Sequence, residues 1–134
     1  MSEISNLLNL QSKLKDKKID LLIVNRSDEF LNEYISPYAE RLQFITNFSG
    51  SAGKAIVLQN EAYLYVDGRY TFQAKEQINE NEIQSKHLKS FWEDLKTYVS
   101  KKSCTIAVDP KLHSIREIQK IQEYILNTSS NIIF

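Results

Sequence analysis

The sequence contains few of the residues that cross-link or sharply bend a chain. Among 134 residues there is one cysteine, Cys104, so an internal disulfide is excluded. A single thiol is typical of proteins from a reducing compartment. There are only 3 glycines and 2 prolines. The chain therefore has to obtain its stability from a packed core, and it is long enough for one such domain.

The sequence also lacks net charge and long apolar runs. Lys and Arg together number 17, as do Asp and Glu, so no excess of positive charge favours nucleic acid or an anionic membrane. No apolar run approaches the roughly 20 residues that span a bilayer. The first residues, MSEISNLLNLQSKLKDKKID, lack the basic start and unbroken apolar core of a signal peptide. We expect a cytoplasmic protein with no nucleic-acid or membrane partner.

Short apolar runs alternate with patterns of helical period along the chain. Strands are expected at Ile19–Asn25, Lys54–Gln59, Ala62–Asp67, Glu82–Lys86, Cys104–Asp109 and Asn131–Phe134. Helices are expected at Ile4–Lys18, Ser36–Ile45, Gly68–Ile78, Ser90–Val99 and Ser114–Leu126. This order predicts a single α/β domain over residues 1–134, with a mixed β-sheet, helices on both faces and one central hairpin. Because the chain ends on the apolar NIIF, we expect that it was cut from a longer polypeptide.

Several helix boundaries and faces can be named from local patterns. Ser90 with Glu93, and Ser114 with Glu117, form capping-box patterns. A further helix start is expected at Ser36, with Pro37 at its first position; that helix would bury Leu42 and Ile45. The apolar face of the first helix is predicted to consist of Ile4, Leu7, Leu8 and Leu14.

The stretch FSGSAGKAIVL, residues 48–58, resembles a phosphate-binding loop only at its Gly-Lys pair. The pattern of that loop requires glycine where Phe48 stands and Ser or Thr where Ala55 stands, and it leads into a helix. Here the following residues predict a strand. We therefore interpret the stretch as a turn into the hairpin, with Gly50 and Gly53 needed for chain freedom or for close packing.

Catalytic side chains form no convincing constellation. His87 and His113 lie far apart and beside no set of Asp, Glu or Cys at metal-ligand spacing. Cys104 begins a predicted buried strand, which favours a core thiol over a nucleophile. Ser51 lacks the glycine two residues before it that a hydrolase elbow requires. The sequence predicts no catalytic residue and no metal ligand in this chain.

The tripeptide Asp67-Gly68-Arg69 has a structural and a functional interpretation. Asp67 would cap the helix that follows, Gly68 would make the turn, and Arg69 would lie in the first helical turn. The Arg69 guanidinium could also bind a partner carboxylate through two hydrogen bonds. The two roles are compatible with each other.

Two motifs in the middle of the chain carry a family resemblance. RLQFITNFSGSAGKAIVLQNEAYLYVDGRYTFQAKEQI, residues 41–78, resembles the N-terminal domain of Xaa-Pro aminopeptidases (aminopeptidase P) in the creatinase/prolidase family. The glycine-rich stretch and the D-G-R-Y motif stand at the separation that is typical of this family. Asn47 departs from it, because glycine is common there.

The resemblance implies a ribonuclease-H-like α/β fold and a non-catalytic role. In the family, a separate C-terminal domain hydrolyses the bond before proline with two metal ions, usually manganese. This chain alone is therefore expected to bind no cofactor and to be inactive, while its parent would be a dimeric metallopeptidase. Its expected partners are the C-terminal domains of the same polypeptide, a second copy and the peptide substrate. The resemblance suggests the following residues for shaping substrate access or an interface: Arg41, Phe48, Gly50, Ser51, Gly53, Asp67, Gly68 and Arg69.

Two hypotheses for the function follow. The first is the non-catalytic N-terminal domain of a metalloaminopeptidase that removes the residue preceding proline. The alternative is a free-standing interaction module that uses the same fold, since a fold alone does not decide function.

Overall fold

The computed structural model describes residues 6–25, 41–46, 48, 53–101, 104–108, 115–125 and 130–133. The helices are α1 (Asn6–Asp16), α2 (Arg41–Thr46), α3 (Thr71–Gln77), α4 (Phe91–Lys101) and α5 (Ile115–Ile125), with short 3-10 helices η2 (Gly68–Tyr70) and η3 (Leu88–Ser90). The strands are β1 (Leu21–Asn25), β2 (Lys54–Leu58), β3 (Ala62–Val66), β4 (Gln84–His87), β5 (Thr105–Val108) and β6 (Asn131–Ile133). The predicted α/β order, with its central β2–β3 hairpin, is confirmed.

The six strands form one mixed sheet in the order β4-β3-β2-β1-β5-β6. β1 is parallel to β5, β5 to β6, and β3 to β4, whereas β2 is antiparallel to both of its neighbours. Five strands therefore run in one direction and β2 alone runs in the other. The carboxyl ends of these five strands lie along one edge of the sheet, which we call the carboxyl edge; the opposite edge is the amino edge.

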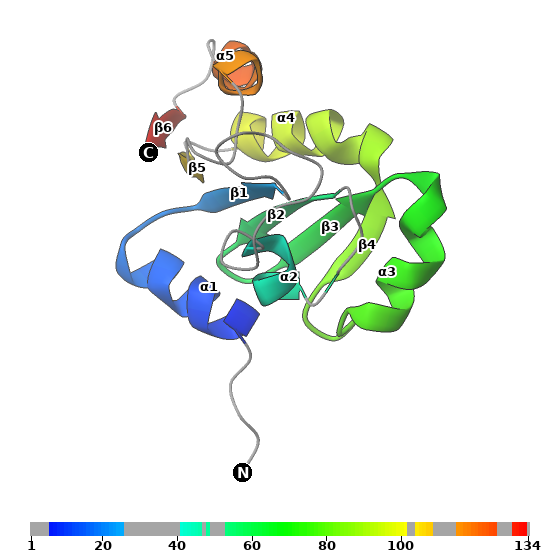
Figure 1. Ribbon diagram of the computed structural model, residues 1–134. Coiled ribbons are helices and arrows are strands. Elements are labelled where there is room, and N and C mark those ends of the chain that lie inside the picture. Colours follow the sequence, from blue (N-terminus) through cyan, green and yellow to red (C-terminus); the bar gives the residue numbers. More distant parts are fainter. Residues whose placement is uncertain are drawn as a thin grey trace.

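Helices cover both faces of the sheet, as predicted. Figure 1 shows α1, α2 and α3 on one side of the sheet and α4 and α5 on the other. The strands supply alternate side chains to the two layers, as the two-residue period of a strand requires. In β1, for example, Val24 belongs to the core under α1–α3, and Leu21 and Ile23 belong to the core under α4 and α5. None of the described helices is both long and apolar enough to cross a membrane.

The buried face of α1 differs from the prediction. Leu7 and Leu14 are buried as expected, but Leu8 is 43% exposed and the third buried position is Gln11. Residues 7, 11 and 14 follow a helical face at steps of four and three. The amide of Gln11 is satisfied there because it donates to the carbonyl oxygens of Leu58 and Glu61, each at 3.1 Å. Ile4 lies outside the described residues.

The end of α1 has a Schellman arrangement without glycine. The Ile19 amide donates to the Leu14 carbonyl at 2.9 Å, and the Lys18 amide donates to the Lys15 carbonyl at 3.2 Å. Lys18 has a φ of 58°, the left-handed conformation that this motif needs and that glycine adopts most easily. The chain thus turns from α1 into β1 at some cost in backbone energy.

The structure describes only part of the predicted helix at residues 36–45 and all of the one at residues 90–99. Leu42 of α2 is buried as predicted, whereas Ile45 is only half-buried, and Ser36 and Pro37 lie outside the described residues. α4 begins at Phe91, directly after Ser90, and the capping box of Ser90 with Glu93 stays a prediction. The 3-10 helix η3 before α4 has a cap of its own, in which His87 Nδ1 accepts from the Lys89 amide at 3.1 Å.

Candidate functional site

The family-type motifs meet at the carboxyl edge of the sheet. Asp67 follows β3, Lys54 begins the reversed strand β2, and Asn25 ends β1. Asn25 and Lys54 are cross-strand partners in the β1–β2 register. In open α/β sheets, ligands bind at the carboxyl ends of strands. This edge is therefore the candidate functional site.

The Asp67-Gly68-Arg69 turn is held by its own hydrogen bonds. Asp67 Oδ1 accepts from the Arg69 amide at 2.9 Å, which confirms the predicted cap. The guanidinium donates back to the same carboxylate, with Nε 3.3 Å from Oδ1 and Nη2 3.0 Å from Oδ2. The hydrogen bond from Arg69 lowers the pKa of the Asp67 carboxyl. The turn thus presents an arginine side chain that is 75% exposed but restrained.

The surroundings of this turn are partly aromatic. The Arg69 guanidinium lies 5.3 Å from the centre of the Tyr70 ring, a favourable position for a cation. Phe72, on the next turn of helix, is 74% exposed. His87 is exposed at the end of the neighbouring strand β4, and its Nε2 lies 4.0 Å from the position that a Cβ on Gly68 would occupy. These residues form a rim surface, which we define as Asp67, Arg69, Phe72 and His87.

Phe48 and Gly53 lie inside the domain and not on this rim surface. Phe48 is 1% exposed, its amide donates to the buried Thr46 hydroxyl at 3.1 Å, and its ring meets the Tyr70 ring edge-on at 5.9 Å. A Cβ on Gly53 would lie 3.1 Å from Leu42 Cδ2 and 3.2 Å from Phe48 Cε2. Close packing therefore leaves little room for a Cβ at Gly53, which is the second of the two reasons that the sequence left open.

The other suggested residues are only partly described. Arg41 begins α2, but its side chain lies outside the described part of the structure. All of Asn47, Gly50, Ser51 and His113 lies outside it. Gly68 has no positive φ, so the turn at this position does not depend on glycine. Of the suggested residues whose side chains are described, only Asp67 and Arg69 place polar atoms on the rim surface.

Sequence reasoning missed a polar cluster beside this edge. Glu117 of α5 accepts from Lys54 Nζ at 2.8 Å and from Asn25 Nδ2 at 3.1 and 2.9 Å. Glu117 was predicted to complete a capping box with Ser114, which lies outside the described residues. Its observed partners are 63 and 92 residues away in the sequence, so no local pattern could have revealed them.

The same cluster shows which groups Lys54, the lysine of the glycine-rich stretch, contacts in the fold. Lys54 Nζ lies 4.7 Å from the centre of the Phe91 ring and 5.4 Å from that of Trp92, in addition to its ion pair with Glu117. Residues Lys54–Leu58 form strand β2, as predicted, and not a helix. The lysine is thus used inside the fold, where it joins β2 to α4 and α5.

A second polar group joins α4 to the sheet. Asp94 Oδ2 accepts from the Tyr65 hydroxyl at 2.6 Å and from Lys86 Nζ at 2.9 Å. Burial alone would raise the pKa of Asp94, but the hydrogen bonds from Tyr65 and Lys86 outweigh it and lower that pKa. Burial, with the hydrogen bond to Asp94, raises the pKa of Tyr65 far above its usual range. The arrangement suits a structural clamp, because the tyrosine stays protonated.

The described residues form no recognisable catalytic centre. Within them, no group of three or more His, Cys, Asp or Glu side chains is arranged to hold a metal ion. Cys104 is 3% exposed, in agreement with the predicted core thiol. A dinuclear metal centre therefore does not fit the described part of this chain.

Comparisons with known proteins agree on one family. The sequence model described as "Creatinase/Prolidase N-terminal domain" matches residues 7–132. The chain is 32% identical over 130 residues to "Probable Xaa-Pro aminopeptidase P" of Coccidioides posadasii (strain C735) and 33% identical over 130 residues to the protein of that name in Aspergillus fumigatus (strain CBS 144.89). Each match covers 95% of this chain but 20% of the relative, so the chain spans about a fifth of the length of these relatives.

Solved structures show the same fold. An X-prolyl aminopeptidase from Caenorhabditis elegans, described as a cytosolic enzyme with a di-nuclear active site, superposes with a TM-score of 0.79 at 23% identity, over 86% of this chain and 19% of that one. The N-terminal domain of a putative metallopeptidase from Corynebacterium diphtheriae superposes with a TM-score of 0.65 at 17% identity, over 96% of this chain and 95% of that one.

Proposed function

Because this chain belongs to the Creatinase/Prolidase N-terminal domain family, we propose that it is the non-catalytic N-terminal domain of a Xaa-Pro aminopeptidase. The observation that carries the proposal is the coverage of its relatives: 95% of this chain matches only 20% of proteins named as Xaa-Pro aminopeptidases. The absence of a catalytic constellation among the described residues is compatible with chemistry that takes place elsewhere in a longer protein. The coverage also favours this role over a free-standing interaction module.

The proposed reaction is hydrolysis of the peptide bond that precedes proline. Two metal ions, which we propose to be manganese, would supply Lewis-acid activation of water and of the substrate carbonyl outside this chain. The contribution of this chain would be positional. It would pack against the C-terminal domains of the same polypeptide, help to form a homodimer, and limit the active site to peptide N-termini.

The rim surface is the part of this chain best suited to that positional role. Its arginine is oriented by Asp67 through two exposed side-chain hydrogen bonds, and partial preorganisation of this kind would reduce the entropic cost of contact with a partner. Phe72 adds an aromatic side chain that is 74% exposed. We propose that this surface faces another domain or the substrate.

The test is to express the complete reading frame from the source and to measure release of the N-terminal residue from Xaa-Pro peptides with added manganese. The full-length protein should cleave them, and the present chain alone should not. A full-length product that is inert on such peptides would contradict the proposal. A natural product of about the 15.6 kDa of this chain, seen by immunoblot, would instead favour the free-standing module.

The rim surface can be tested in the same full-length protein. Arg69→Ala and Phe72→Ala should raise KM or weaken the dimer while leaving the stability of this domain nearly unchanged, because both side chains are largely exposed. Lys75→Ala replaces an exposed residue of α3, the helix that contains Phe72, and is the matched control. Equal kinetics and equal dimer stability in all three variants would rule out this surface.

We also propose a cytoplasmic location for the parent. The C. elegans structure is that of an enzyme described as cytosolic, and the lone buried Cys104 suits a reducing compartment. Cell fractionation with an antibody against this domain tests the location, and light scattering of the purified full-length protein tests the dimer.

A further inference from the structure

Helix α3 has an outer face that the packing of the domain does not use. Figure 1 shows α3 at the β4 end of the sheet. Its inner side is anchored by the fully buried Ala74 and by Ile78, directly after the helix and 7% exposed. On the outer side, Phe72 is 74% exposed, the largest exposed fraction of any large apolar side chain among the described residues. A single exposed ring is common on proteins, so the charges around it decide what it can bind.

Opposite charges flank Phe72 at helical spacing. Arg69 stands three residues before it, and Glu76 stands four residues after it. A turn of 3.6 residues places both within roughly 60° of the direction of Phe72, and residues at these spacings are neighbours on a helix surface. The Arg69 side chain is 75% exposed, and Glu76 is exposed as well. The outer face therefore presents a cation, an aromatic ring and an anion in that order along the helix.

The arginine of this face is already oriented. Asp67 accepts from its Nε at 3.3 Å and from its Nη2 at 3.0 Å. A guanidinium carries five N–H donors and can bind carboxylates on more than one side. The pair with Asp67 is thus compatible with a bond from Arg69 to a second carboxylate.

The order of the charges makes this face complementary to itself. Consider two copies of α3 packed antiparallel about a two-fold axis at Phe72. Positions before Phe72 on one helix then face positions after it on the other, so Arg69 of each copy meets Glu76 of the other copy. A parallel arrangement would instead place like charges together. An interface with two-fold symmetry contains every such contact twice, and both Arg69–Glu76 contacts are attractive.

We propose that the α3 face, defined as Arg69, Phe72 and Glu76, binds a second copy of this chain, with the two Phe72 rings at the two-fold axis. The inference deepens the homodimer of the proposed function and rests on that part of it. A helix of 7 residues is only about 10 Å long, so its face is smaller than the roughly 800 Å² per partner of a standard interface. The dimer of this chain alone is therefore weak and forms at high protein concentration.

The test is sedimentation equilibrium of this chain at concentrations up to about 1 mM, with charge reversals that use the two-fold symmetry. Arg69→Glu and Glu76→Arg should each weaken self-association about tenfold or more, because both contacts in a dimer of either variant join like charges. An equimolar mixture of the two variants should associate again, because one variant is acidic at both positions and the other is basic at both. Phe72→Ala should also weaken the dimer about tenfold or more, as expected for loss of a central aromatic side chain.

Lys96→Glu is the control, since it reverses an exposed charge on α4, which covers the other face of the sheet. It should leave self-association unchanged, and circular dichroism of every variant verifies folding. A native chain that stays monomeric at 1 mM, an unaltered dimer in Phe72→Ala, or a mixture that associates no better than its two components would each overturn the proposal. Cleavage of Xaa-Pro peptides by the full-length protein is measured separately, so a monomeric chain would leave the peptidase assignment intact.

Discussion

The two described glycines differ in whether the structure leaves room for a side chain. Gly53 has no positive φ, but the space where a side chain would begin is occupied by Leu42 and Phe48. Gly68 also has no positive φ, and the nearest atom to its missing Cβ is His87 Nε2 at 4.0 Å. Packing disfavours a side chain at the first glycine, whereas neither packing nor the local backbone disfavours one at the second.

Replacing these glycines by alanine should separate the two cases. Gly53→Ala is expected to destabilise the domain by about 1–3 kcal/mol, because the added methyl group would push against the buried Leu42 and Phe48 side chains. Gly68→Ala should be neutral or should stabilise by up to about 1 kcal/mol, because it restricts the unfolded chain. Urea denaturation of both proteins measures the difference. Equal stabilities would show that the Gly53 contacts relax without cost.

Lys18 offers a second prediction at the scale of one residue. Its φ of 58° places a residue with a Cβ in the left-handed region, which costs about 1–2 kcal/mol relative to ordinary backbone. Lys18→Gly should therefore stabilise the domain by about 0.5–1 kcal/mol, after the greater entropy of glycine in the unfolded chain is subtracted. Lys17→Gly, one residue earlier, should destabilise. A fall in the urea midpoint for Lys18→Gly would contradict this account.

At the scale of elements, one carboxylate joins each of the two helices on the second face to the sheet. Glu117 connects α5 to β1 and β2 through Asn25 and Lys54, and Asp94 connects α4 to β3 and β4 through Tyr65 and Lys86. The apolar faces of these helices supply the driving force for packing, for example through Leu95 and Ile121. The carboxylates add one polar link between each helix and two neighbouring strands.

Removal of Glu117 should be costly because two partners lose their acceptor. Glu117→Ala leaves Lys54, whose side chain is 22% exposed, without its ion-pair partner, and removes the acceptor of the Asn25 amide donor. We expect a loss of about 2 kcal/mol, between the values for a surface pair and a fully buried one. Glu123→Ala, on the exposed side of the same helix, should change stability by less than about 0.5 kcal/mol. Similar losses in both variants would indicate an effect on helix propensity alone.

The Asp94 clamp should be visible in the pH dependence of stability. The folded-state pKa of Asp94 is lowered, below the ordinary value of about 3.9. Its ionised form therefore contributes stability that is complete above about pH 4 and is lost as the pH falls through the lowered pKa. Asp94→Asn should cost about 1 kcal/mol at neutral pH, and the difference from the native protein should shrink below pH 4.

Urea denaturation of both proteins between pH 2.5 and 7 tests this prediction. Glu80→Gln replaces an exposed residue in the turn before β4 and is the control. Its difference in stability from the native protein should not shrink as the pH falls. A constant difference across the whole pH range would mean that the charge of Asp94 contributes nothing to the clamp.

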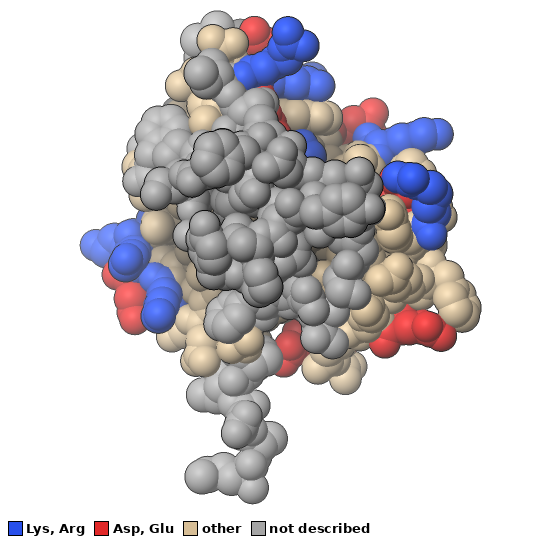
Figure 2. Space-filling view, in the orientation of Figure 1, with Lys and Arg blue, Asp and Glu red and all other residues tan. Residues whose placement is uncertain are grey.

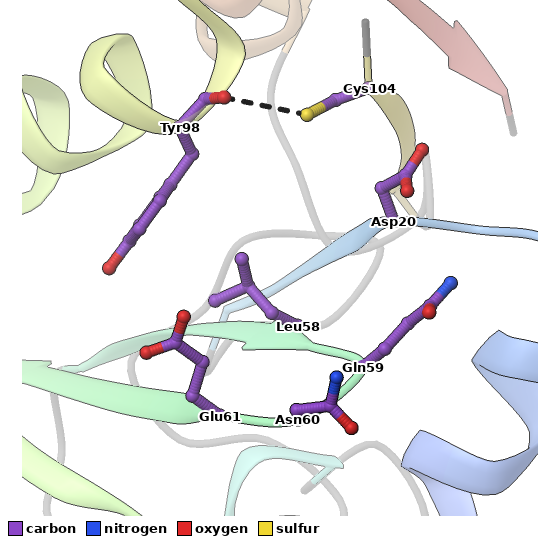
Figure 3. Close-up of a pocket in the computed structure, with 7 residues that line it drawn as sticks. All are labelled: Asp20, Leu58, Gln59, Asn60, Glu61, Tyr98 and Cys104. Atoms are coloured by element: carbon purple, nitrogen blue, oxygen red, sulfur yellow. Dashed lines mark hydrogen bonds between the residues drawn. The ribbon is translucent and has the colours of Figure 1, made fainter. Parts of the chain in front are cut away.

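At the scale of the whole molecule, the two edges of the sheet have different characters. The carboxyl edge carries the restrained Arg69 and the exposed Phe72, and the amino edge carries a hollow of about 260 Å³ whose lining includes Asp20 and Glu61 (Figure 3). Figure 2 shows the visible cationic and anionic side chains of the described residues interspersed on one face of the molecule. The even charge balance of the sequence thus appears on this face as a mixture of both signs.

This arrangement makes a further prediction about nucleotides. The lysine of the glycine-rich stretch is bound to Glu117, and β2 follows it in place of the helix that a phosphate-binding loop requires. Mg-ATP at millimolar concentration should therefore leave the thermal midpoint of unfolding unchanged. A reproducible rise that increases with ATP concentration would reverse the interpretation, since stabilisation follows from binding to the native state.

The sequence by itself determined the order of elements, the fold class and the family. Strands such as Leu21–Asn25 and the β2–β3 hairpin are strongly specified by short β-rich runs that flank a polar turn. The cap by Asp67 was also predictable, because it involves residues two apart. Local patterns suffice for features of this kind, since the interacting groups lie within one turn of the chain.

Only the tertiary structure decided which polar residues work together. The cap predicted for Glu117 and Ser114 is local, and Ser114 lies outside the described residues. The bonds of Glu117 to Lys54 and Asn25 join it to strands that lie 63 and 92 residues away in the sequence, and no local pattern predicts them. Leu8 was expected in the core, but the helix turns Gln11 inward to meet the hairpin. The hollow likewise gathers Asp20, Glu61 and Tyr98 from separate elements. Such contacts depend on the register of the sheet and the position of each helix, which the packing of the whole core determines.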